Sequence, residues 1–429
     1  MDFLLDNVGF IAIFLLFLFM LLTIPVFVAM GLSAFLAAIL IDDPFQTFRS
    51  FIQISWQGAS IFELIAIPLF IYTGTIMQRS GAGGDLFDFT KAWVGSIPNS
   101  LGLATIIACG IFSAISGSSI ACAATVGLVA IPLLRQEGYS ESQAGGFVAG
   151  GGTLGIIIPP SIPLILYGVL TETSIGQLFI AGVVPGTVML TLFGIYVLIS
   201  RPTIRTRHIV PLAERIRITK RAIGIILLAP AIIIAIYMGI FTPTEVGALA
   251  VIYVTVLGFA QRRLNWEKFR DATLSAIETS CMLFMLIVFG QYFAHFLTYE
   301  QMPQIIAQSI IENASGFLAL NLMILTYLIM GMFLESAAML LISIPIFFPV
   351  AMQIGMDPLV FGIFAVIAME IAQISPPVGI NLFTIYGISK IPLSKIAWGA
   401  APFLLVQIGM LYAVYFLPDM ATWLPASMK

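Results

Sequence analysis

The sequence predicts an all-α polytopic membrane protein built as an inverted repeat of two halves, each with a re-entrant helical hairpin and a Pro-Pro broken helix. The 429-residue chain is 60% hydrophobic and only 9% charged, whereas soluble domains carry about 25% charged residues. Apolar runs of about 20 residues, enough to cross roughly 30 Å of hydrocarbon, recur along the chain. Prolines interrupt two of these runs, in "LGIIIPPSIP" (154–163) and "AQISPPVGIN" (372–381).

The first half is predicted to contain three spans, an apolar pair, a broken span and a final span. These lie at 8–22, 24–41, 51–78, 97–115 with 118–134, 142–170 and 177–200. The first apolar run lacks a basic n-region and an A-x-A cleavage signal, so it is interpreted as two retained spans and not as a signal peptide.

The second half is predicted to repeat this order after a polar linker, 201–221. Its elements lie at 222–240, 244–260, 271–298, 317–333 with 336–352, 357–388 and 395–418. Two further segments, 84–95 and 300–316, each precede an apolar pair. Both are too polar to span a bilayer, and we expect them to lie in its interface.

Each apolar pair has a polar interruption in its middle. The first pair carries a Ser/Gly cluster from Ser113 to Ser119, and the second carries Gly331, Glu335 and Ser336 at the matching place. The arms look too short, and too polar at these points, for two comfortable crossings each. A re-entrant hairpin, with its tip at mid-membrane and its backbone buried in protein, fits better.

The distribution of basic residues agrees with two inverted halves. Five crossings per half invert the second half, and a cytoplasmic 201–221 linker then places all Lys and Arg except Arg49 and Lys429 inside, 16 of the 18. The positive-inside rule demands this bias. Both termini are predicted to be periplasmic. Charge alone does not prove the hairpins, because a pair of full crossings leaves every later loop on the same side.

A Pro-Pro pair inside a span frees backbone carbonyls that lipid leaves without a donor. A cation such as Na+ that takes these carbonyls as ligands offsets the missing hydrogen bonds. The Gly-rich run "AGGGTLG" (149–155) lets neighbouring backbone approach closely. Broken helices in inverted repeats indicate a transporter site. The alternative is that the prolines only kink a helix for packing.

Acidic residues in apolar segments are candidates for function. Glu335, at the second hairpin tip, lines the substrate path, carries a proton or bonds to backbone N–H groups; the sequence leaves these three roles open. Cys109, Cys122 and Cys281 show no metal-ligand spacing. The chain has no phosphate loop, no catalytic constellation and no feature that predicts an enzyme or a nucleic-acid partner.

Several long stretches resemble the large membrane subunit, the DctM type, of tripartite ATP-independent periplasmic (TRAP) transporters. In the first half they are "LIAIPLFIYTGTIM" (64–77), "GIFSAISGSSIACAATVGLVAIPLL" (110–134) and "GGTLGIIIPPSIPLILYG" (151–168). In the second half they are "FTPTEVGALAVIY" (241–253), "GMFLESAAMLLISIPIFFPV" (331–350), "GMDPLVFGI" (355–363) and "ISPPVGINLF" (374–383). The resemblance runs along nearly the whole chain.

This resemblance implies a permease subunit of the bacterial inner membrane that imports a carboxylate-bearing solute, of the sialic acid or C4-dicarboxylate class, with a Na+ gradient. A periplasmic substrate-binding protein would deliver the solute. A small membrane subunit of the DctQ type would pack against the scaffold. The resemblance also implies an elevator mechanism, in which a transport domain slides against a scaffold within the lipid bilayer.

The resemblance places two Na+ sites. The first would use Ser113, Ser116, Gly155, Ile158 and Pro159, and the second Gly331, Ala372, Ser375 and Val378. The substrate would lie between the hairpin tips, with candidate contacts at Ser118, Ser119, Thr153, Glu335, Ser336 and Asn381. The second tip departs from the family pattern, because Ser336 stands where proline usually follows the acidic residue, and Ala372 stands where glycine is common.

The expected domains follow from these assignments. The scaffold comprises 1–95 and 222–315, each with an arm helix, and 201–221 is the cytoplasmic basic linker. The transport domain comprises 96–200, with hairpin 97–134 and broken helix 142–170, and 316–429, with hairpin 317–352 and broken helix 357–388. The alternatives are a self-sufficient Na+ or H+/carboxylate symporter of the same architecture and an ion channel.

Overall fold

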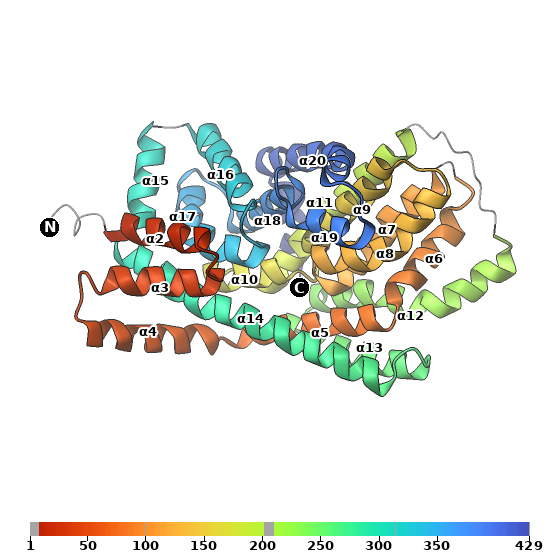
Figure 1. Ribbon diagram of the computed structural model, residues 1–429, viewed down its shortest axis with the longest axis horizontal. Helices are drawn as coiled ribbons and strands as arrows, with labels where there is room; N and C mark the ends of the chain where they lie inside the picture. The colour runs from red at the N-terminus through yellow and green to blue at the C-terminus, as the bar shows by residue number, and fades with distance from the viewer. Residues whose placement is uncertain (1–7, 98, 201–209, 314, 429) are drawn as a thin grey trace.

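The computed structural model describes residues 8–97, 99–200, 210–313 and 315–428. Helices and the loops between them make up this part of the chain, in which there are no strands (Figure 1). The order of elements predicted from the sequence recurs in both halves, so the all-α polytopic fold class is confirmed.

The helices of the first half begin with a short antiparallel pair and end with a long helix. They are α2 (Val8–Leu21), α3 (Val26–Ala38), α4 (Pro44–Ala59), the 3₁₀ turn η1 (Phe62–Ile65), α5 (Ala66–Arg79), α6 (Ala82–Val94), α7 (Ser100–Ser116), α8 (Ser119–Gln136), α9 (Glu141–Ile157), α10 (Ile162–Thr171) and α11 (Ile175–Ile199).

The second half repeats this series and adds a short terminal helix. Its helices are α12 (Leu212–Tyr237), α13 (Pro243–Ala260), α14 (Trp266–Tyr299), α15 (Met302–Asn313), α16 (Gly316–Met330), α17 (Ser336–Gln353), α18 (Pro358–Ile374), α19 (Ile380–Ser389), α20 (Leu393–Phe416) and α21 (Asp419–Ala426).

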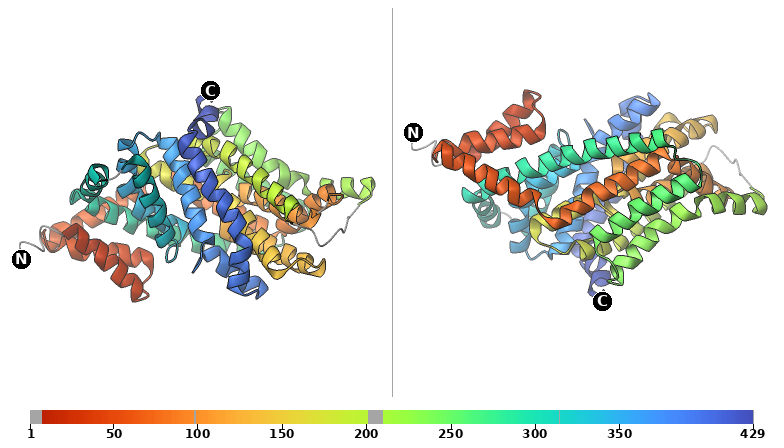
Figure 2. Two further views of the ribbon diagram at one scale, coloured as in Figure 1. Left: turned by 90° about the horizontal axis from the view of Figure 1, so that it is seen from above. Right: turned by 90° about the horizontal axis from the view of Figure 1, so that it is seen from below.

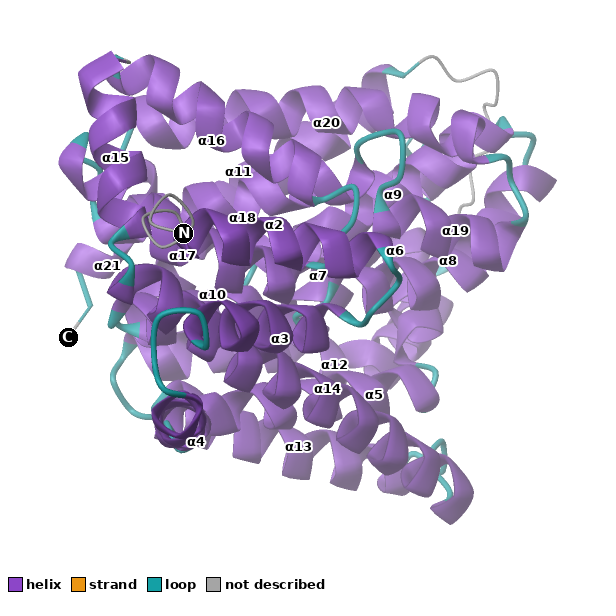
Figure 3. Cartoon of the chain, turned by 60° about the vertical axis from the view of Figure 1, so that its left-hand side comes forward, coloured by secondary structure: helices purple, strands orange, loops and turns teal. Residues whose placement is uncertain are grey.

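One layer of the molecule is formed by helices from both predicted scaffold segments. In Figures 1 and 3, α4, α5, α12, α13 and α14 run along the lower side. The view from below in Figure 2 shows α14, α5 and α13 side by side, and α5 packs against both of its neighbours. The packing of α3 on α14 mirrors that of α13 on α5, as a repeat requires.

The second layer is built around α9, which packs against α7, α8 and α20. The two halves also cross over. The helix after the first break, α10, packs against α17 of the second hairpin, and the helix after the second break, α19, packs against α8 of the first. This exchange holds the two hairpins and the two breaks in one body. The division into a moving and a fixed domain remains a prediction.

Eight helices in the described part of the chain are long and apolar enough to cross a membrane, or nine if α4 and α5 count as one span. Helix α2 matches the first predicted span, 8–22, to within one residue, whereas α3 is shorter than the second, 24–41. Helices α2 and α3 have 14 and 13 residues, or about 20 Å at 1.5 Å per residue. Pro25 separates them, and Thr23 adopts a φ of 61° in the turn.

Two other boundaries differ from the prediction. The span expected at 51–78 is two helices that meet at a 62° bend, because α4 ends at Ala59 and η1 starts only at Phe62. The linker expected at 201–221 is already helical from Leu212, since α12 begins before the apolar run. Residues 1–7, 201–209 and 429 lie outside the described residues. The predicted periplasmic location of the two termini falls on residues of this group.

The arm helix α6 is tied to the first layer by a charged cluster. Asp85 is 4% exposed and pairs with Arg263, in the turn before α14, and with Nε of Arg221 of α12 at 3.0 Å. Arg263 is itself largely buried, at 14% exposure. A buried charge needs a partner, so this cluster fixes α6 to the helices that lie below it.

Replacing Asp85 with asparagine is expected to lower the free energy of unfolding by about 3–5 kcal/mol, the loss typical when one partner of a buried ion pair is removed. Thermal unfolding in detergent measures this. Asp88, which is exposed on the same helix, provides the matched control, and Asp88→Asn should change stability little. Equal losses in the two variants would contradict the anchoring role of Asp85.

Candidate functional site

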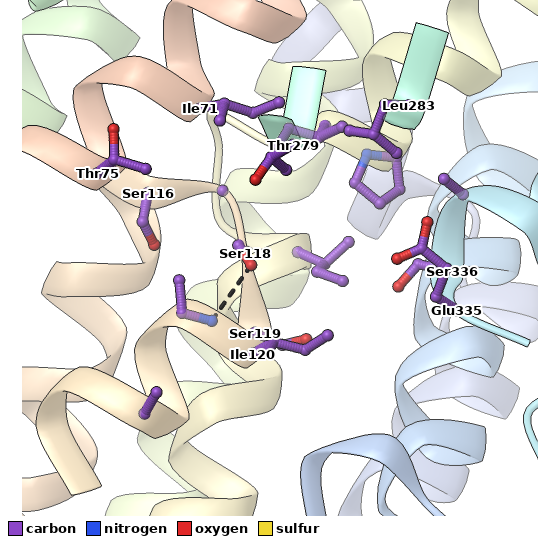
Figure 4. Close-up of a pocket in the computed structure, with 18 of the residues that line it drawn as sticks. Ile71, Thr75, Ser116, Ser118, Ser119, Ile120, Thr279, Leu283, Glu335 and Ser336 are labelled. Atoms are coloured by element: carbon purple, nitrogen blue, oxygen red, sulfur yellow. Dashed lines mark hydrogen bonds between the residues drawn. The ribbon is translucent and has the colours of Figure 1, made fainter. Parts of the chain in front are cut away.

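A cavity of about 420 Å³ lies between the two hairpin tips and two helices of the first layer. Tip residues Ser116–Ala121 form one wall and Glu335–Ala337 the opposite one, while Ile71 and Thr75 of α5 and Thr279 and Leu283 of α14 complete it. In Figure 4, Ser118 and Ser119 face Glu335 and Ser336 across the open space. The cavity therefore lies between the two layers.

Three helices begin at this cavity. Ser119 and Ser336 are the first residues of α8 and α17, and Ile162 and Pro163 open α10. A helix N-terminus carries unpaired backbone N–H groups and the positive end of the helix dipole, so it attracts anions. Glu335 is the sole charged residue among the cavity-lining residues, and no lysine or arginine lines it. An anion in this cavity would therefore be attracted only by polar groups such as backbone N–H, and it would be opposed by an ionised Glu335.

The first hairpin tip lies against the first helix break. Gly117 has a φ of +61°, and a Cβ atom there would stand 2.8 Å from the carbonyl oxygen of Pro160. A Cβ on Gly155 would stand 3.0 Å from the hydroxyl oxygen of Ser113. Both glycines thus permit a close approach of backbone that a larger residue would prevent.

The Pro-Pro pair frees particular carbonyls. In a continuous helix the N–H groups of residues 159 and 160 would donate to the carbonyls of Gly155 and Ile156, but Pro159 and Pro160 have no N–H. The hydroxyls of Ser113 and Ser116 are buried beside this break and have no hydrogen-bond partner. Oxygen atoms without donors therefore gather where the resemblance places the first Na+ site.

The other two residues of that predicted site also lie at the break. Ile158 is the C-cap of α9, donates its N–H to the carbonyl of Leu154 and packs against Gly186. Pro159 is buried. The structure thus brings all five predicted residues to the junction of tip and break.

The second break is more open than the first. Gly331, at the end of α16, packs directly against Ala372 of α18, where a Cβ on the glycine would collide with the alanine. Ser375 and Val378 lie in the loop between α18 and α19 and are partly exposed. The Ser375 hydroxyl donates to the carbonyl of Pro376 at 3.4 Å, and the Ala372 carbonyl accepts from the Ser375 N–H at 3.3 Å. Fewer oxygens are left without donors here.

The structure gathers four of the six predicted substrate contacts around the cavity: Ser118, Ser119, Glu335 and Ser336. The other two do not line it. Thr153 is fully buried in α9, donates to the Gly150 carbonyl at 2.7 Å and accepts from Gln407 of α20. Asn381 is fully buried in α19, and neither atom of its amide has a partner.

Sequence reasoning missed residues on both sides of the cavity. Thr75, Gln78, Ser275 and Thr279 line it from the first layer. Behind the tips, Gln373 of α18 bonds both hairpins. Glu370, an acidic residue in an apolar segment and therefore a candidate for function from the sequence, is fully buried one turn before it. The sequence signal that could have identified Gln373 is its position, as a polar residue, within the largely apolar "AVIAMEIAQI" (365–374).

Comparisons with known proteins agree with this architecture. Residues 13–420 match the family model described as the tripartite ATP-independent periplasmic transporter, DctM component. A C4-dicarboxylate TRAP transporter large permease protein of Pseudomonas aeruginosa is 38% identical over 92% of this chain and 93% of its own length. A sialic acid TRAP transporter large permease protein of Vibrio cholerae is 33% identical over 86% of this chain and 87% of its own.

A solved structure shares the fold. The YdaH transporter of Alcanivorax borkumensis superposes with a TM-score of 0.65 over 96% of this chain and 100% of its own, at 14% sequence identity.

The close packing of tip and break predicts the effect of substitutions at glycines. Gly117→Ala is expected to destabilise the protein by about 1–2 kcal/mol from the left-handed backbone alone, with an added loss from the contact with Pro160. Gly409→Ala, in α20 where no atom lies within 4 Å of the new Cβ, should instead be neutral or stabilising. Thermal unfolding measures both, and a harmless Gly117→Ala would contradict the geometry described here.

Proposed function

This chain belongs to the DctM component family of tripartite ATP-independent periplasmic transporters, and we propose that it couples uptake of a carboxylate-bearing solute to a Na+ gradient. It is the large permease subunit of such a transporter, a polytopic protein of the bacterial inner membrane. The relatives are named as permease subunits and not as enzymes. The solute, the ion and the motion are the proposed parts.

The convergence of three helix N-termini on one cavity is the observation that carries the carboxylate proposal. Without a lysine or arginine among the lining residues, an anion would bind to the free N–H groups of α8 and α17, to the Ile162 N–H of α10 and to the Ser336 hydroxyl. The Ser119 hydroxyl donates its proton to Gln373, and in α10 Pro163 has no N–H and the Leu164 N–H donates to Ser161. A relative is named for C4-dicarboxylates and another for sialic acid, and these names support the same class of solute.

The oxygens at the first break support the choice of cation. Uncharged oxygen atoms that can serve as cation ligands are buried at this place. They belong to the hydroxyls of Ser113 and Ser116 and to the freed carbonyls of Gly155 and Ile156. Small hard cations prefer oxygen ligands. A Na+ bound here would tie the first hairpin tip to the broken helix and add positive charge beside the cavity.

The arrangement of layers supports an elevator motion. The tips, both breaks and α18 belong to one layer, whereas Thr75 and Thr279 of the opposite wall belong to the other. Where the tip meets α5, Gly74 faces Ser116, and a Cβ there would stand only 3.2 Å from the Cβ of that serine. A small residue at this contact lets the tip layer slide past α5 with its bound solute.

The proposed partners are a periplasmic substrate-binding protein and a small DctQ-type membrane subunit. The competing proposal is a symporter that needs neither protein, and the requirement for the binding protein separates the two.

The experiment is uptake into proteoliposomes that hold this chain and its small subunit. With the periplasmic protein outside, radiolabelled succinate or N-acetylneuraminate should accumulate under an inward Na+ gradient and not under an equal choline gradient. The Ser113→Ala/Ser116→Ala variant should raise the Na+ concentration for half-maximal uptake by about tenfold or more, because each lost ligand to a charge contributes about 1.5–3 kcal/mol.

The matched control is Ser33→Ala in α3, a buried serine that does not line the cavity and that bonds its own helix at the Met30 carbonyl. It should leave the Na+ dependence unchanged. Uptake that is equal in choline would overturn Na+ coupling, and uptake without the periplasmic protein would favour the self-sufficient symporter.

A further inference from the structure

Gln373 joins the two hairpin tips through one side chain. Its Oε1 accepts a hydrogen bond from the Ser119 hydroxyl at 3.0 Å, and its Nε2 donates to the Ser336 hydroxyl oxygen. The side chain is 1% exposed and does not itself line the cavity, whereas both serines do. The bridge therefore stands behind the wall that the proposed solute would contact.

The two serines occupy equivalent positions in the repeat. Ser119 is the first residue of α8 and Ser336 is the first residue of α17, so the bridge runs from the tip of one half to the tip of the other. Corresponding residues of the two halves are 217 positions apart, as Pro159 and Pro376 show. Ile156 is therefore the residue of the first half that corresponds to Gln373. Ile156 cannot make such bonds, so the bridge comes from one half alone.

The bridge fixes the distance between two anion-attracting helix N-termini. A buried amide that loses its partners costs about 1–3 kcal/mol, so the bonds to both serines are maintained while the tips stay packed. A ligand that contacts both N-termini needs them held in the right place, because misplacement of about 1 Å weakens a preorganised site strongly.

We propose that Gln373 is a positioning residue for the solute: it holds the N-termini of α8 and α17 in register, so that one anionic group binds both. This rests on the proposed function in so far as the solute is an anion.

Hydrogen–deuterium exchange of the complex in Na+ buffer tests the bridge without any solute. Gln373→Leu keeps the approximate volume and removes both bonds. Backbone amides of 117–124 and 334–341 should then exchange at least about tenfold faster, as loss of roughly 1.4 kcal/mol implies. Gln373→Met, which also removes both bonds but keeps an unbranched side chain of similar length, should give the same acceleration.

Gln407→Leu is the matched control. Gln407 is also a fully buried glutamine that bonds a hydroxyl on another helix, Thr153 of α9, away from the cavity. Its loss should lower the melting temperature but leave exchange at the tips unchanged. Equal exchange in Gln373→Leu and wild type, or the same acceleration in Gln407→Leu, would overturn the bridging role.

Uptake kinetics test positioning. With the probe that wild type transports, succinate or N-acetylneuraminate, Gln373→Leu should raise KM by about tenfold with less than about a twofold change in kcat, because only binding is weakened. Added to Ser119→Ala/Ser336→Ala, the same change should have little further effect, since Gln373 acts through those serines. A full additive loss would overturn positioning. If wild type transports neither probe, the proposed function fails, and the exchange data alone then decide the role of Gln373.

Discussion

The fold depends on the need to satisfy every backbone polar group away from water. A helix does this for itself, and the chain interrupts that arrangement only where protein surrounds the gap. At Pro159 and Pro160 the missing N–H groups leave the carbonyls of Gly155 and Ile156 without donors. The tip of the first hairpin lies against this gap, with Gly117 beside the carbonyl of Pro160. Burial of the break, the short residues of the tip and the cluster of unpartnered oxygens all follow from this constraint.

The two halves meet the same constraint differently. The first break is buried, and the serine hydroxyls beside it have no partner. At the second break, Ser375 bonds to the neighbouring backbone and the prolines are exposed. The second half instead contributes Gln373, whose amide is hydrogen-bonded to one tip through its oxygen and to the other through its nitrogen. The two halves therefore share a topology but differ in their chemical roles. The first half provides oxygen atoms that can bind a cation, and the second provides the side chain that links the two hairpin tips.

The sequence was enough to predict the order of elements, since composition, hydropathy and the two Pro-Pro pairs are local signals. The resemblance also named Ser118, Ser119, Glu335 and Ser336 together, and the structure brings these four residues around one cavity. Sequence reasoning failed where distant packing decides. The Thr153 hydroxyl accepts a hydrogen bond from Gln407, 254 residues away, and so does not face the cavity. The role of Gln373 depends on Ser119 and Ser336, one from each hairpin. The length of α3 and the bend after Ala59 depend on the turns at Thr23 and Ser60, which apolar content does not reveal.

The central claim is that the first break exists to provide cation ligands, and equilibrium binding of ²²Na+ to the purified complex tests it most directly. In Pro159→Ala/Pro160→Ala the restored N–H groups can bond the carbonyls of Gly155 and Ile156, which removes them as ligands. The account predicts that ²²Na+ affinity falls by about tenfold or more while the melting temperature in choline is maintained or raised. Unchanged ²²Na+ affinity in a folded variant would contradict it and would leave the prolines a role in packing alone.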